Sequence, residues 1–383
     1  MKRIICAATM CSCCVLSSTQ AGDETTALPA PETASGADSG GGDWWRDLFS
    51  GVNRLDVQAE TLRSSDIDID QKTIQFEIQQ PIWSFSLTAG HTDYGIDYKP
   101  AIVGSEAFLS EETWQWQGRI GAKLNERWSF DFSTRHYDGY SGYRSIWIAE
   151  RFRQGFGFSP IYQKPDPGGY SYSASALYSY LSGHSVRLSI GYGRDTIAPG
   201  YSIGVGGIER SRDTLFRRSS TLRFEDVWTP WLKSENTISV ADVTLRKKRW
   251  SAKSTWHVAL GSDWTLRANV GYSEEAPLFE AKYGGLSVEW NFTGNWHISA
   301  GVDVYSDTGE IPNAGLITTA APGVDTVQYG IGLRWVGESS AFRIYAAMYE
   351  NDYGALGINN QFLKNLYRDR DWVMVQLSYT YQF

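Results

Sequence analysis

The chain ends in DWVMVQLSYTYQF, residues 371–383. Apolar side chains stand at every second position from Val373 to Phe383, and mostly polar ones stand between them. Successive side chains of a β-strand point to opposite sides of a sheet, so the pattern predicts a strand with one apolar and one largely polar face. The edge of a soluble sandwich and the wall of a membrane barrel both contain such strands. The recurrence of the pattern along the chain has to decide between them.

Aromatic residues and glycine are abundant in this chain of 383 residues, which has 16 Trp, 22 Tyr, 16 Phe and 38 Gly. Aromatic side chains favour strands and glycine favours turns, which indicates an all-β protein. The formal net charge of −8 argues against general nucleic-acid binding. No stretch after the N-terminal segment approaches the ~20 consecutive apolar residues of a membrane-spanning helix.

The N-terminus reads as an export signal. Residues 1–21, MKRIICAATMCSCCVLSSTQA, have a basic start, an apolar stretch and small residues before Ala21, which predicts a signal peptide cleaved after that residue. A lipoprotein signal at Cys13 is the other reading. All four cysteines lie inside this segment, so the mature chain has no disulfide, thiolate metal site or cysteine nucleophile. Export then leads to a secreted, a periplasmic or an outer-membrane barrel protein.

Residues 22–51 are predicted to be a disordered periplasmic linker. Residues 22–43 contain almost no large apolar side chain and are rich in Pro, Gly, Ser and acids. A short aromatic segment, WWRDLF at residues 44–49, follows and could lie at a membrane surface or in a barrel mouth. Residues 52–383 carry the strand pattern.

The closing pattern recurs along the chain. Segments that begin at Trp83, Trp114, Trp264, Trp296 and Val327 repeat the same alternation. Their polar faces carry charges and amides, which pack poorly in a dry core but sit well in a wet lumen. Trp and Tyr gather at strand ends, which is typical of the aromatic girdle at a membrane interface. Together these features predict a transmembrane, antiparallel, up-and-down β-barrel.

The connections alternate in length, as they do between the two rims of such a barrel. Seven short ones are predicted at residues 79–83, 125–127, 182–184, 229–231, 261–263, 293–295 and 337–340. Longer ones are predicted around residues 98–112, 138–169, 195–213, 273–280, 306–325 and 351–370. This rhythm predicts sixteen strands, with fourteen and eighteen left open because the register is ambiguous near residues 144–158 and 233–248.

The chain resembles a bacterial outer-membrane β-barrel of the porin-like kind over residues 52–383, without matching a specific family. Barrels of this class typically end in an aromatic residue that follows apolar residues at alternate positions, as Tyr379, Tyr381 and Phe383 do here. The resemblance implies that these residues signal membrane insertion to the barrel-assembly machinery of a Gram-negative bacterium. It also implies outer-membrane lipid and lipopolysaccharide as surroundings, and a homotrimer as one available oligomeric state.

The polar face of the predicted strands would line the lumen. A barrel of about sixteen strands is wide enough for a water-filled channel, whose wall charges tune the passage of ions. The candidate pore-lining residues carry both signs of charge: Arg119, Lys123, Asp131, Arg135, Arg187, Arg223, Glu225, Lys253, Arg267, Glu289, Asp303, Arg334 and Arg343. The alternative is a solvated wall whose charges only pair with their neighbours.

Loop 138–169 is the longest predicted connection. In sixteen-stranded general porins the loop at this place folds inward and narrows the pore. The resemblance therefore implies a constriction loop whose Arg144, Glu150, Arg151 and Arg153 line an eyelet, although the acidic motif of general porins is missing here. The alternative is an extracellular hairpin standing above the barrel.

Little in the sequence suggests catalysis, a cofactor or a metal. His91 and Asp93 fall on one face near an outer rim, which is the only arrangement of that kind. Residues 66–70, DIDID, are expected to be an exposed acidic turn, and residues 200–207 to be flexible loop material. The predicted function is passive diffusion of small hydrophilic solutes through the barrel. No enzymatic activity is predicted. The alternatives are a barrel for export of a polysaccharide, or a plugged barrel that serves as a structural anchor or adhesin.

Overall fold

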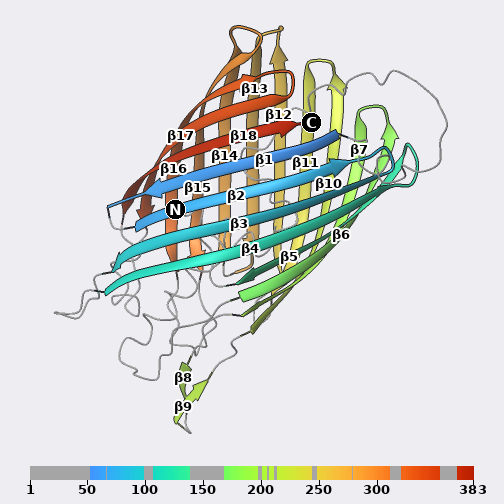
Figure 1. The fold of residues 1–383 in the computed structure, drawn as a ribbon. Helices are drawn as coiled ribbons and strands as arrows, with labels where there is room; N and C mark the ends of the chain where they lie inside the picture. The colour runs from blue at the N-terminus through green and yellow to red at the C-terminus, as the bar shows by residue number, and fades with distance from the viewer. Residues whose placement is uncertain are drawn as a thin grey trace.

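The computed structural model describes residues 52–65, 67–98, 107–138, 168–196, 201–204, 207–210, 214–243, 248–277, 279–310, 321–353 and 369–383. The predicted signal peptide, the predicted linker and nearly all of the predicted constriction loop lie outside these residues. The described chain consists of β-strands joined by turns (Figure 1). No helix in this part of the chain is long and apolar enough to cross a membrane.

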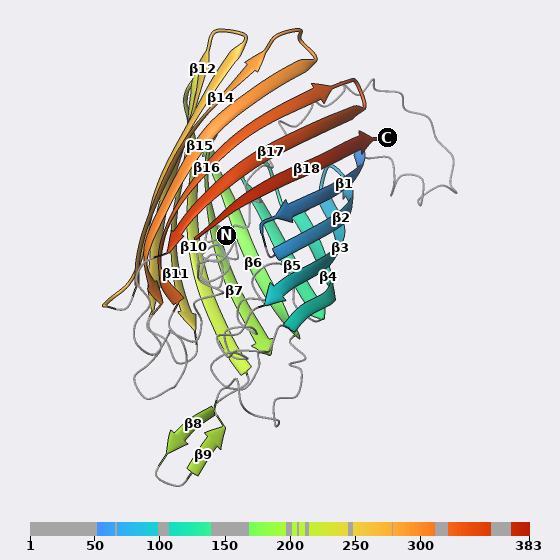
Figure 2. The same ribbon diagram turned by 90° about the vertical axis from the view of Figure 1, so that its left-hand side faces the viewer.

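Sixteen strands form one closed antiparallel barrel, so the predicted fold and strand number are confirmed (Figures 1 and 2). The barrel strands are β1 (Val52–Arg63), β2 (Ile67–Gln79), β3 (Trp83–Tyr98), β4 (Ala107–Lys123), β5 (Trp128–Asp138), β6 (Gly168–Leu181), β7 (His184–Thr196), β10 (Thr214–Thr229), β11 (Leu232–Val243), β12 (Arg249–Leu260), β13 (Trp264–Glu275), β14 (Phe279–Asn291), β15 (Trp296–Glu310), β16 (Ala321–Val336), β17 (Ser340–Tyr353) and β18 (Arg370–Gln382). Each strand pairs with its neighbours in sequence, apart from the β7–β10 pair, which a hairpin separates.

The barrel closes between its first and last strands. β1 pairs with β18 from Arg54 opposite Gln382 to Arg63 opposite Val373. The final residue also takes part: the Phe383 N–H donates to the Asn53 carbonyl oxygen at 3.0 Å, and the Asn53 N–H donates to the Phe383 carbonyl oxygen at 3.2 Å. Closure leaves no sheet edge facing lipid, where each unsatisfied backbone group costs several kcal/mol.

Seven short connections lie at one end of the barrel, the turn rim, at the positions that the sequence predicts. Three of them contain a glycine with a left-handed backbone, Gly183, Gly261 and Gly294. Of these, Gly261 has φ 77° and Gly294 has φ 76°. An added Cβ would meet nothing within 4 Å at either position. These glycines are therefore required by the left-handed backbone and not by lack of space.

The opposite end, the loop rim, corrects three expectations. β13 and β14 continue to Glu275 and from Phe279, so the connection expected at 273–280 shrinks to three residues. Residues 67–70 of the expected acidic turn belong to β2 and pair with β1, and the exposed Asp70 accepts a 2.7 Å hydrogen bond from Arg63. The expected loop at 195–213 contains a small hairpin, β8 (Tyr201–Gly204) with β9 (Gly207–Arg210), drawn apart from the barrel in Figure 1. Polar strand ends beyond the membrane resemble loops in sequence, because water solvates both.

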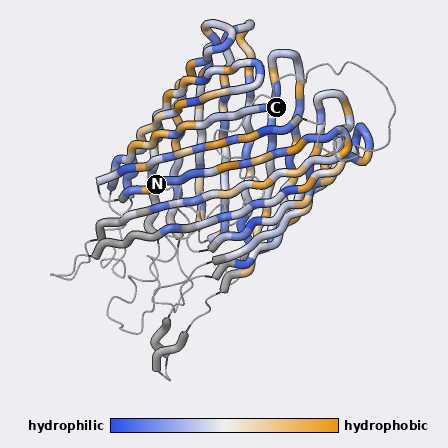
Figure 3. Tube along the Cα trace, in the orientation of Figure 1, coloured by the Kyte–Doolittle hydropathy of each residue, from blue (hydrophilic) through white to orange (hydrophobic). Residues whose placement is uncertain are grey.

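The two faces of the sheet differ in chemistry, as the alternating colours along the strands of Figure 3 show. Large apolar side chains of one face are exposed, among them Ile120, Val270 and Ile331. Indole rings gather near the turn rim on this face, where Trp264 stacks on Trp290 at 5.4 Å. This is the lipid-facing outer surface, and the polar face is the inner wall.

The inner wall is not polar throughout. Near the loop rim of β12–β18 it carries a set of buried side chains, here called the packed arc: Arg249, Glu275, Phe279, Tyr305, Thr326, Tyr349, Asn351 and Trp372. Trp372 has 0% of its surface exposed. In this part of the wall the inward-facing polar side chains are therefore buried among aromatic rings.

Candidate functional site

The inner wall is the candidate site, and the register places all thirteen predicted pore-lining residues on it. Paired residues lie on the same face of a sheet. Lys123 faces Ser129, Arg187 faces Arg223, and the pairing continues strand by strand around the barrel. The thirteen residues that share this face are Arg119, Lys123, Asp131, Arg135, Arg187, Arg223, Glu225, Lys253, Arg267, Glu289, Asp303, Arg334 and Arg343. Their action on a permeating solute stays a prediction.

On β3–β7 the inner wall is built from small hydroxyl side chains, and we call it the open arc. Its serines are Ser84, Ser86, Ser129, Ser133, Ser171, Ser173, Ser175, Ser179, Ser185 and Ser189. Serine is short, so charged side chains on the same strands reach past it into the lumen. The hydroxyls also bond across strands, as Ser133 and Ser173 do at 2.6 Å.

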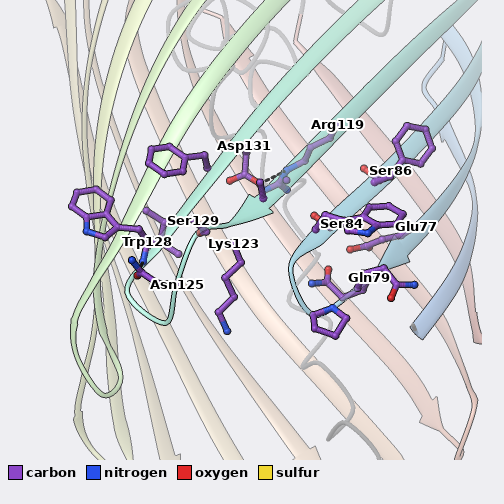
Figure 4. Close-up of a pocket in the computed structure, with 18 of the residues that line it drawn as sticks. Glu77, Gln79, Ser84, Ser86, Arg119, Lys123, Asn125, Trp128, Ser129 and Asp131 are labelled. Carbon is purple, nitrogen blue, oxygen red and sulfur yellow. Dashed lines mark hydrogen bonds and ion pairs between the residues drawn. The ribbon is translucent and has the colours of Figure 1, made fainter. Parts of the chain in front are cut away.

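Asp131 lies at the centre of the open arc and binds two guanidinium groups. Arg119 donates to its Oδ1 from Nε at 3.2 Å and from Nη2 at 2.8 Å. Arg187 donates to the other oxygen, Oδ2, from Nη1, and Ser175 donates to Oδ2 at 3.1 Å. One carboxylate thus serves two cations, which leaves one positive charge over. Figure 4 shows Arg119 and Asp131 together on the inward side of β4 and β5.

A cavity of about 450 Å³ opens beside this group toward the turn rim. Its lining includes Glu77, Ser84, Arg119 and Lys123 (Figure 4). The Arg119 side chain is 47% exposed, and Lys123 is exposed as well. Solute that enters the lumen can therefore reach both cations directly.

Elsewhere on the wall most predicted charges are paired. Arg223 contacts Glu235 at 2.7 Å and Glu225 at 3.0 Å. Arg334 contacts Glu289 at 2.6 Å. Such pairs present little net charge to the lumen.

The structure adds inner-wall charges that the sequence reasoning missed. Arg249 and Glu275, only 1% and 3% exposed, form a 2.9 Å ion pair, and the guanidinium carbon of Arg249 lies 3.9 Å from the centre of the Phe279 ring. Arg217, Lys233 and Glu235 also face inward. Extending the odd-numbered parity through the ambiguous region 233–248 would have found Lys233 and Glu235.

The four predicted residues of the constriction loop, Arg144, Glu150, Arg151 and Arg153, lie outside the described residues.

His91 and Asp93 share a face of the sheet, as predicted from the sequence, and that face is the outer one. Glu112 lies beside them, and ligand atoms of the three residues lie within 4.8 Å of one another. Glu112 is largely exposed, and exposed acidic groups of this kind are common without an ion, so no metal site is assigned.

The predicted insertion signal lies on the outer face of the last strand. Tyr379, Tyr381 and Phe383 are all exposed there. The Phe383 ring lies 5.8 Å from that of Tyr381 and 6.4 Å from that of Phe76 on β2. The aromatic end of the chain thus covers the closure strands on the lipid side, while its recognition by assembly machinery stays a prediction.

Comparison with known proteins supports the fold alone. No family model matches the sequence, and no curated protein is detectably similar to it in sequence. The structure is similar to a bacterial polysaccharide outer membrane secretin, with a TM-score of 0.50, 9% identity, and coverage of 86% of this chain and 98% of the other.

Two proteins of pseudomonads are similar at lower TM-scores. OccK3 (OpdO) of Pseudomonas aeruginosa has a TM-score of 0.46 and 10% identity, covering 88% of this chain and 98% of that one. OprB of Pseudomonas putida has a TM-score of 0.45 and 12% identity, covering 92% and 100%. The chain therefore has the fold of a bacterial outer-membrane β-barrel, a closed barrel of sixteen antiparallel strands with its apolar face outward.

Proposed function

We propose that the barrel is a passive pore for small hydrophilic solutes. One observation carries this proposal: the inner wall of the open arc is hydroxyl-rich and charged, and its cations are accessible beside a cavity of about 450 Å³. Sixteen strands give a barrel wide enough to hold water. Apolar packing would be the stable lining of a closed barrel, so half-buried serines beside the exposed Arg119 and Lys123 favour a wet lumen.

Selectivity in this proposal comes from the thirteen wall charges and from loop 138–169, folded inward as a constriction. Surrounding lipid and lipopolysaccharide, delivery by the barrel-assembly machinery and a homotrimeric state belong to the same proposal. No catalytic step is assigned to any residue.

Single-channel conductance in a planar bilayer tests the proposal. The protein is refolded into detergent, and its barrel form is verified by the shift in gel mobility on heating before insertion. Steady conductance steps are expected. Silence from protein verified as folded would overturn the passive pore and leave the two alternatives, a structural or adhesin barrel and an export pore that a partner must open.

A further inference from the structure

The inner wall carries more positive than negative charge, although the chain as a whole has a net charge of −8. Its basic residues with described side chains are Arg54, Arg119, Lys123, Arg135, Arg187, Arg217, Arg223, Lys233, Arg249, Lys253, Arg267, Arg334 and Arg343. Its acidic residues with described side chains are Asp56, Glu60, Glu77, Asp131, Glu225, Glu235, Glu275, Glu289, Asp303 and Asp307. Within the described strands, the acids therefore lie in excess outside the lumen.

Among the side chains that the structure describes, the surplus lies on one side of the barrel. There β4–β7 contribute Arg119, Lys123, Arg135 and Arg187 to the inner wall and one acid, Asp131. On the remaining strands the described basic and acidic side chains are equal in number. The described charges are therefore more positive on the open arc than on the rest of the wall, and low-dielectric walls focus the field of such charges.

Four cations also lie on one continuous row across the wall. The row follows the pairing of seven neighbouring strands, β4 to β12, about 4.8 Å apart. Its positions, in order, are Lys123, Ser129, Leu177, Arg187, Arg223, Thr237 and Lys253. No acid interrupts this basic row.

Lys123 and Arg187 of the row, and Arg119 beside them, have N–H groups that no described protein group accepts. Lys123 has no ion pair within the described part of the chain. Arg119 uses Nε and Nη2 on Asp131, and Arg187 uses Nη1, so further N–H groups of both guanidinium groups are directed at no described protein group. A guanidinium group presents five donors in a planar fork that matches a carboxylate.

We propose that the pore selects small anionic solutes, and that Arg119, Lys123 and Arg187 form a binding site for a solute carboxylate. The protein already contains one example of this binding, because Arg119 and Arg187 both bind the Asp131 carboxylate. The solute carboxylate binds on the lumen side of the same two guanidinium groups. Lys123 attracts it electrostatically as it approaches, and the Ser84 and Ser129 hydroxyls are further hydrogen-bond donors. This assignment rests on the proposed pore function.

The test measures reversal potential across a KCl gradient at about 0.1 M, where the Debye length is about 10 Å. The sign expected is that of chloride preference. Lys123→Glu should lower the chloride-to-potassium permeability ratio by roughly twofold or more, since wall charges set ion selectivity. Lys72→Gln, an exposed cation on the outer face of β2, is the control for a lost charge outside the lumen and should leave the ratio unchanged.

Solute binding is read from block of the potassium chloride current by succinate, with glucose as the neutral control. Succinate should block the wild type, and Arg119→Gln should weaken that block without closing the channel. Block by inorganic phosphate but not by succinate would overturn the carboxylate assignment. Conductance with cation preference, or with no preference, would overturn this inference and leave the pore intact, whereas absence of conductance would overturn the pore itself.

Discussion

The open arc and the packed arc are opposite solutions to one problem, the lining of a barrel. Both are inner faces of antiparallel strands with the same alternation of side chains. The open arc uses serine beside exposed cations, while the packed arc uses aromatic rings around a buried ion pair. The difference teaches that alternation sets which side chains face inward, while their size and pairing decide whether the wall is open to solute.

The largest expected effect is a loss of stability when a tightly packed side chain of the packed arc is truncated. Trp372→Ala should destabilise the barrel by about 3–5 kcal/mol, because the side chain is fully buried and its removal leaves a cavity. Leu177→Ala, on the inner face of the open arc, is the matched control and should cost clearly less, since Leu177 is only half-buried. Urea titration of refolding in detergent or lipid measures both, and equal losses would remove the distinction between the arcs.

Ion pairs should show the same contrast. Arg249→Met leaves Glu275 as a buried charge without its ion-pair partner and should cost about 3 kcal/mol or more. Arg119→Met should cost about 1 kcal/mol or less, because Arg119 is half exposed and Asp131 keeps Arg187. The double variant Arg249→Met with Glu275→Leu should recover much of the loss. A double variant as unstable as the single one would mean that shape, not charge, decides this site.

Glycines sharpen the comparison further. A Cβ at Gly330 would overlap the ring of Tyr345, which lies across that position in β17. Gly330→Ala should therefore cost about 1–3 kcal/mol through overpacking, and it should reduce conductance as the ring moves inward. At Gly118, on the outer face of β4, an added Cβ would meet only the Thr134 methyl group at 3.6 Å, so Gly118→Ala should have little effect on either quantity. The ratio of the two conductance changes is the measurement.

The smallest contrast concerns single hydrogen bonds. Thr326 donates to Asn351 at 2.7 Å in the packed arc, and both residues are buried. Thr326→Val should cost about 1–3 kcal/mol, because the change removes a buried partner. Ser173→Ala breaks the Ser133 contact in the open arc and should cost about 1 kcal/mol or less, since water replaces it. Equal unfolding midpoints for the two variants would contradict a wet open arc.

Much of the barrel was predictable from short stretches of sequence. The positions of the seven turns, the closing strand and the inward face of residues such as Arg119 and Arg334 follow from a period of two. The predicted loop at 273–280 is too long because Glu274 and Glu275 resemble loop residues in sequence, whereas Glu275 belongs to β13 and is buried against Arg249. No local sequence pattern predicts that ion pair, because Arg249 lies 26 residues from Glu275 in the chain.

The sequence by itself determined the barrel, the approximate number of its strands and the division of side chains between its outer and inner faces. These properties depend on backbone geometry within each strand and on hairpins between neighbours. Only the tertiary structure decided that Asp131 is shared by Arg119 and Arg187, that four cations align in a row, and that one side of the wall is packed. Those features depend on the relative register of several strands and on closure of β1 against β18, and such distances are set across the whole barrel at once.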